Sequence, residues 1–83
     1  MLDVKEAAQK ASEYFAALYA DQNVSKVQLE EVELSDDGQY WLITLSYPVM
    51  GPLLTMPPKR KYKVFKIDAK TGAVKSMKIR KVD

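Results

Sequence analysis

The chain has 83 residues, 47% hydrophobic and 29% charged, which is typical of one globular domain with a single thin core. It contains no Cys and no His, which excludes disulfides, thiolate or imidazole metal sites and His-based nucleophilic triads. The net charge of +2 is unevenly distributed: residues 1–58 hold three lysines against nine acidic residues, and residues 59–83 hold ten basic residues against two acidic ones. An uneven charge of this kind can steer a partner.

The first predicted element is a helix over about residues 3–21. Asp3 is placed to cap it, and Glu6 stands three residues later, at the position of a capping box. Apolar residues recur at spacings of three and four and predict one apolar stripe along the helix. The stripe comprises Val4, Ala7, Ala8, Ala11, Phe15 and Leu18.

The next two elements are strands joined by a turn. Residues 27–34 alternate, but the alternation slips at Glu30-Glu31, which predicts a β-bulge that returns Val27, Leu29, Val32 and Leu34 to one face. Residues 35–38 read Ser-Asp-Asp-Gly, a strong turn signal. Residues 39–47 are the clearest strand, and Pro48 ends it.

Residues 49–58 form a predicted loop, which contains three prolines and is unusually apolar for a loop. A third strand over residues 61–67 and a fourth over 73–82 flank the turn at 68–72, where Gly72 supplies the left-handed position. The expected buried set is Phe15, Leu18, Trp41, Ile43, Leu45, Phe65, Ile67 and Met77, with Ile79 beside Met77 on the inward face. The opposite face is expected to carry Leu42, Thr44, Ser46, Tyr62, Val64 and Val74.

The order helix-strand-strand-strand-strand with short connections predicts an α+β fold. We expect one N-terminal helix packed on a four-stranded antiparallel meander sheet, as a single domain over residues 1–83.

The C-terminal hairpin resembles the end of a PepSY-type domain. That family closes with a strand, an Asp-x-x-Thr-Gly turn and a final strand that begins with an apolar residue; here these are residues 64–67, then Asp68, Thr71 and Gly72, then Val74. The resemblance implies a cystatin-like helix-on-sheet architecture and a binding or peptidase-regulating role. Small bacterial immunity proteins with a related helix-on-sheet fold end similarly, which implies a toxin as the alternative protein partner.

A protein-binding or inhibitory module without enzymatic activity is therefore the first functional hypothesis. Its expected contact residues are the apolar loop, for affinity, and the basic start of the third strand, for steering. They are Leu53, Leu54, Met56, Lys59, Arg60, Lys61 and Tyr62. Burial of the loop on the core is the competing interpretation.

A basic nucleic-acid-associated protein is the alternative function, because Tyr62 stands among lysines and could stack on a base. Against it, the lysines fall on both faces of two strands, and Lys on a strand edge commonly guards against aggregation. Asp36-Asp37 is interpreted as an exposed turn, and Glu30, Glu31 and Glu33 as a solvated edge. We expect no catalytic residues, no cofactor and no metal, and see no signal peptide or membrane span; a cytoplasmic location is the default, with a trimmed export signal as the alternative.

Overall fold

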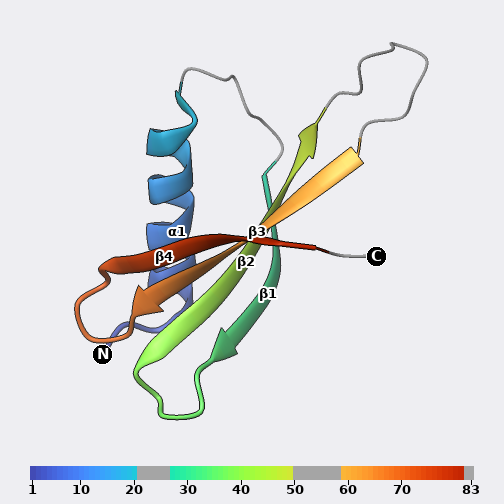
Figure 1. The fold of residues 1–83 in the computed structure, drawn as a ribbon. Helices are drawn as coiled ribbons and strands as arrows, with labels where there is room; N and C mark the ends of the chain where they lie inside the picture. Colours follow the sequence, from blue (N-terminus) through green and yellow to red (C-terminus); the bar gives the residue numbers. More distant parts are fainter. Residues whose placement is uncertain (21–26, 50–58, 82–83) are drawn as a thin grey trace.

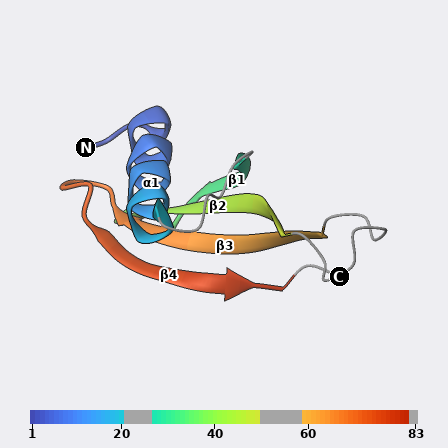
Figure 2. The same ribbon diagram turned by 90° about the horizontal axis from the view of Figure 1, so that it is seen from above.

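A single helix crosses one face of a four-stranded antiparallel sheet in this computed structural model, which describes residues 1–20, 27–49 and 59–81 (Figure 1). The elements are α1 (Val4–Leu18), β1 (Gln28–Leu34), β2 (Tyr40–Val49), β3 (Lys59–Asp68) and β4 (Val74–Arg80). The strands lie side by side in the order β1-β2-β3-β4. The view from above shows α1 on one side of a curved sheet (Figure 2). The predicted α+β meander is confirmed.

Helix α1 begins with the predicted capping box. The Glu6 amide donates to Asp3 Oδ1 at 2.8 Å, and the Asp3 amide donates to Glu6 Oε1 at 3.2 Å. These bonds satisfy two amides that the first helical turn leaves without intrahelical partners.

The buried stripe of α1 differs from the prediction at its C-terminal end. Ala7, Ala11 and Phe15 are buried, and Tyr19 continues this spacing of four by packing against the core. Leu18 is 50% exposed, so its predicted burial is wrong. At the end of α1, the side chain of Leu18 points away from the sheet. Tyr19, four residues after Phe15, lies on the same side of the helix as Phe15 and reaches the core instead.

The core lies between α1 and the central strands. Ile43, Leu45, Phe65 and Ile67 are almost fully buried, as predicted. Phe15 packs against Tyr47 with the ring centroids 5.1 Å apart and the rings tilted by 44°, and it meets the Phe65 ring edge-to-face at 6.3 Å.

Trp41 and Met77 lie at the margin of this core, half-buried and packed against it, where full burial was expected. The Trp41 indole N–H donates to the Leu2 carbonyl at 3.1 Å. Keeping this polar atom paired holds the ring at the margin.

The first strand contains the predicted bulge. Leu29 pairs with Leu45, but the next pair is Glu31 with Thr44, so Glu30 is the extra residue. Leu29, Val32 and Leu34 are thereby opposite Leu45, Ile43 and Trp41, on the side of the sheet that faces α1.

A second bulge, in β4, overturns one expected position. Lys66 pairs with Ser76 and Ile67 pairs with Val74, so Lys75 is extra and Val74 lies on the helix side, packed against the core. The prediction that Val74 lies on the outer face is wrong, because the alternation was counted without this bulge.

Each of the two hairpin turns that the structure describes carries an aspartate that accepts from the backbone, Asp37 in the β1–β2 turn and Asp68 in the β3–β4 turn. Asp68 Oδ1 accepts from Lys70 and Thr71 at 2.8 and 3.0 Å, and these bonds lower the pKa of Asp68. Gly72 follows with φ +79, and a Cβ there would lie 3.0 Å from Leu2 Cδ1. Glycine is therefore favoured at this turn chiefly by the positive φ, and the nearby Leu2 side chain leaves little room for a Cβ.

Replacing Leu45 with alanine should destabilise the protein by about 2–5 kcal/mol, because Leu45 is 1% exposed and its removal leaves a cavity. Urea unfolding followed by tryptophan fluorescence measures this cost. Leu18→Ala is the matched control on the exposed side of α1 and should change stability by far less; equal effects would contradict the assignment of the core face.

Deleting Glu30 should destabilise the fold, because it removes the extra residue of the bulge and turns part of β1 to the wrong face. Glu30→Ala keeps the residue count and should melt close to the wild type. A deletion variant with the wild-type melting temperature would show that the bulge does not set the register.

Candidate partner-binding surface

The β2–β3 pair extends beyond both of its neighbours at one end of the sheet. Its ladder continues to Val49 opposite Lys59, whereas β1 begins opposite Ser46 and β4 ends opposite Tyr62. Figure 1 shows these ends of β2 and β3 projecting past the other strands. The start of β3, where the sequence predicted partner contacts, is therefore at a protruding end of the sheet.

An open hollow of about 400 Å³ lies at this end, and we refer to it as the basic hollow. Its lining combines five cationic side chains, two tyrosines and one isoleucine. The lining residues are Tyr47, Arg60, Lys61, Tyr62, Lys63, Ile79, Arg80 and Lys81.

The lining side chains come from both faces of the sheet. The strand register places Lys61, Lys63 and Ile79 on the helix side, and Tyr62 and Arg80 on the outer side. The lining side chains thus lie on both faces of the sheet at the end of the β3–β4 pair. A partner that approaches the edge of the sheet could contact side chains of both faces.

Arg60 is fixed by the neighbouring strand. Its Nε donates to Ser46 Oγ at 3.0 Å, and a terminal nitrogen donates to the Ser46 carbonyl at 3.1 Å. Ser46 is fully buried. The planar guanidinium is thus held in one orientation before any partner arrives, which lowers the entropy lost on binding.

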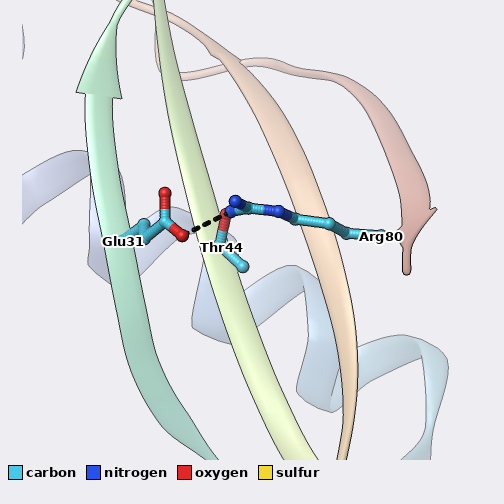
Figure 3. Close-up of polar contacts among 3 residues, drawn as sticks. All are labelled: Glu31, Thr44 and Arg80. Atoms are coloured by element: carbon cyan, nitrogen blue, oxygen red, sulfur yellow. Dashed lines mark hydrogen bonds and ion pairs between the residues drawn. The ribbon is translucent and has the colours of Figure 1, made fainter. Parts of the chain in front are cut away.

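Arg80 reaches across the outer face of the sheet from β4 toward β1. One terminal nitrogen forms an ion pair with Glu31 Oε1 at 2.8 Å and donates to Thr44 Oγ1 at 3.2 Å (Figure 3). The bond to Glu31 and its charge raise the pKa of Arg80. This contact satisfies the hydroxyl of Thr44, which is only 3% exposed.

Ile79 is the apolar member of the basic hollow, and its side chain is 71% exposed. The sequence placed it inward beside Met77, and it does share that side of the sheet, but α1 does not cover this end. Ile79 is the most exposed of the large apolar residues within the described strands, and in the basic hollow it offers a partner an apolar contact beside cationic side chains.

Three of the expected contact residues, Arg60, Lys61 and Tyr62, line one hollow together. Lys59 belongs to β3 opposite Val49. Leu53, Leu54 and Met56 lie outside the described residues, so their predicted contact with the basic segment stays a prediction. The contact residues expected from the sequence did not include Ile79 and Arg80. The β3–β4 register places these two residues opposite Lys63 and Tyr62.

The described residues contain no group of three or more acidic side chains arranged to hold a metal ion. Nor does the described part of the chain include a helix long and apolar enough to cross a membrane.

Comparison of the chain with protein-family models, with curated proteins and with solved structures finds no match.

Replacing Arg80 with alanine should lower the stability, because the buried Thr44 hydroxyl loses a donor and Glu31 loses its ion pair. Val at position 44 has no hydroxyl that needs a donor. In the Thr44→Val background, Arg80→Ala should therefore lower the stability by less. The difference between the two urea midpoints measures the coupling. Equal losses in both backgrounds would contradict the role of Thr44 in holding Arg80.

Proposed function

We propose that this chain is a non-enzymatic module that binds, and thereby inhibits or positions, another protein, and that the basic hollow is its contact surface. The supporting observation is the combination, in one hollow, of exposed Ile79 with cationic and tyrosine side chains. Interface centres are enriched in aromatic residues and Arg, while charges around them raise the association rate.

The chemistry of the hollow favours an acidic protein surface that also offers an apolar side chain. Lys61 and Lys81 are exposed, and Lys63 is half-buried. These cations complement carboxylates, and Ile79 complements an apolar group that a partner must otherwise leave in water. The PepSY resemblance directs the search for this partner first to peptidases, and the immunity-protein resemblance directs it to toxins.

Nucleic acid is the weaker candidate on the same surface. Its phosphates would complement the lysines, but they offer nothing to Ile79. Tyr62, the residue expected to stack on a base, is half-buried, and its neighbour Arg60 is engaged with Ser46. Stacking platforms need an accessible ring face.

The test is affinity capture from a nuclease-treated lysate, followed by binding kinetics with the purified partner. Lys61→Glu with Lys63→Glu should lower the association rate at low salt by about tenfold or more, because the variant replaces an attractive field with a repulsive one. The effect should shrink at high salt.

The matched control is Lys70→Glu with Lys75→Glu, which makes the same charge change on exposed lysines at the other end of the β3–β4 pair. It should leave the association rate close to that of the wild type. If both double variants lowered the association rate equally, the effect would come from the net charge of the chain and not from the basic hollow. Capture that disappears after nuclease treatment, together with tight binding of a labelled single-stranded oligonucleotide, would replace the proposal with the nucleic-acid alternative.

A further inference from the structure

The sheet has two outer strands of equal length, β1 and β4, with seven residues each. Within residues 1–20, 27–49 and 59–81, no strand pairs with the outer side of either. The amide of Ser35 donates to the Tyr40 carbonyl at 2.8 Å. Because hydrogen-bonding direction alternates along a strand, the backbone groups of Leu34 and Val32 point to the open edge of β1.

These two edges carry opposite charge. Strand β1 contains three glutamates and no cation, whereas β4 contains two lysines and one arginine and no acid. On the outer face, the register places Glu31 and Glu33 along β1, and Lys78 and Arg80 along β4.

Both edges also expose apolar side chains on the helix side. Leu29 is 51% exposed and Leu34 is 37% exposed on β1, and Ile79 is 71% exposed on β4. Beside β1, a groove of about 670 Å³ runs between the strand and α1, lined in part by Ala8, Ala16 and Leu29. An edge strand with an apolar groove beside it is suited to accept a further strand whose side chains alternate between apolar and charged.

We propose that this strand is β4 of a second copy of the chain, which pairs antiparallel with β1 and extends the sheet. Strand β4 runs antiparallel to β1 within one copy, since each neighbouring pair in the sheet is antiparallel. A second copy shifted sideways along the sheet therefore presents its β4 in the antiparallel direction, with both helices on the same side.

One register of the new strand pair brings opposite charges together on the outer face and apolar side chains together on the helix side. On the outer face it sets Glu33 opposite Lys78 of the second copy. It also brings the second copy's Arg80 opposite Glu31, which is already paired with Arg80 of its own chain, so Glu33 and Lys78 form the new charge pair. On the helix side it sets Val32 opposite Ile79 and Leu34 opposite Met77, with Ile79 near Leu29 at the mouth of the groove. Opposite charges directly across a strand pair are stabilising and like charges are destabilising.

The same charges oppose the other two pairings. Two β1 edges would bring glutamates together, and two β4 edges would bring cations together. The edges therefore select a head-to-tail contact, which leaves one edge open at each end and permits further copies to add.

The experiment is sedimentation velocity of the full chain from about 10 μM to about 1 mM, a range that covers weak contacts. The average mass should rise continuously with concentration, without stopping at a dimer. Glu33→Lys and Lys78→Glu each should weaken the association by roughly two- to thirtyfold, since each replaces an attractive cross-strand pair with a repulsive one. The chain carrying both substitutions, and an equimolar mixture of the two single variants, should associate as the wild type does.

The side chains of Glu33 and Lys78 make no hydrogen bond or ion pair within the described part of the chain, although the charge of Glu33 helps to raise the pKa of Arg80. Both side chains are exposed. The variants should therefore fold normally, as circular dichroism can verify. Glu13→Lys and Lys70→Glu make the same charge changes away from the edges and should leave the association unchanged.

A wild-type chain that sediments as a monomer over the whole range overturns the proposal. So does association that the double substitution fails to restore. Glu33 does not line the basic hollow, so the result with Glu33→Lys is independent of whether the hollow binds another protein.

Discussion

The close packing of Ala7 and Ala11 against the sheet determines how the rest of the molecule is arranged. These small side chains are fully buried and let the helix backbone approach the central strands, while Phe15 fills the space at the next turn. A helix of 15 residues spans about 22 Å, whereas the ten-residue strands β2 and β3 each span about 33 Å. One helix thus covers the turn end of the sheet and leaves the other end exposed on the helix side. Lysines and Ile79 occupy that uncovered end.

The outer face of the sheet differs from the helix side because it buries two polar side chains in β2, and buried polar groups need hydrogen-bond partners. Thr44 and Ser46 are buried there under the side chains of Arg80 and Arg60, which supply their hydrogen bonds. Every buried side-chain nitrogen or oxygen among the described residues has a partner. Long arginine stems also shield the strands beneath them, so the open face of the sheet is covered by the molecule's own side chains.

Local chemistry made much of the fold predictable. The capping box at Asp3, the glycine turn at Gly72 and the slip of alternation at Glu30 each depend on a few neighbouring residues, and each appears in the structure as expected. The failures depend on tertiary geometry. Whether Leu18 or Tyr19 reaches the core depends on where α1 ends over the sheet, and the face of Val74 depends on a bulge with no clear signal in the sequence.

The candidate site divides in the same way. Arg60, Lys61 and Tyr62 are adjacent in the chain, so a sequence pattern could group them. Ile79 joins them only through the β3–β4 register, and its exposure follows from the limited reach of α1. That exposure is a property of the whole fold, which no local pattern reveals.

The N-terminal segment and α1 contact residues that are far away in the sequence. The Leu2 amide donates to the Ala69 carbonyl at 2.6 Å, and the Leu2 carbonyl accepts from the Trp41 indole. An isolated helix as short as α1 is marginal in water, and its buried partners Phe65 and Ile67 are among the later residues to be synthesised. During translation the helix therefore has no complete surface to pack on until the β3–β4 turn has left the ribosome. We therefore expect folding of these elements to depend on contacts between residues distant in sequence, which favours slow folding.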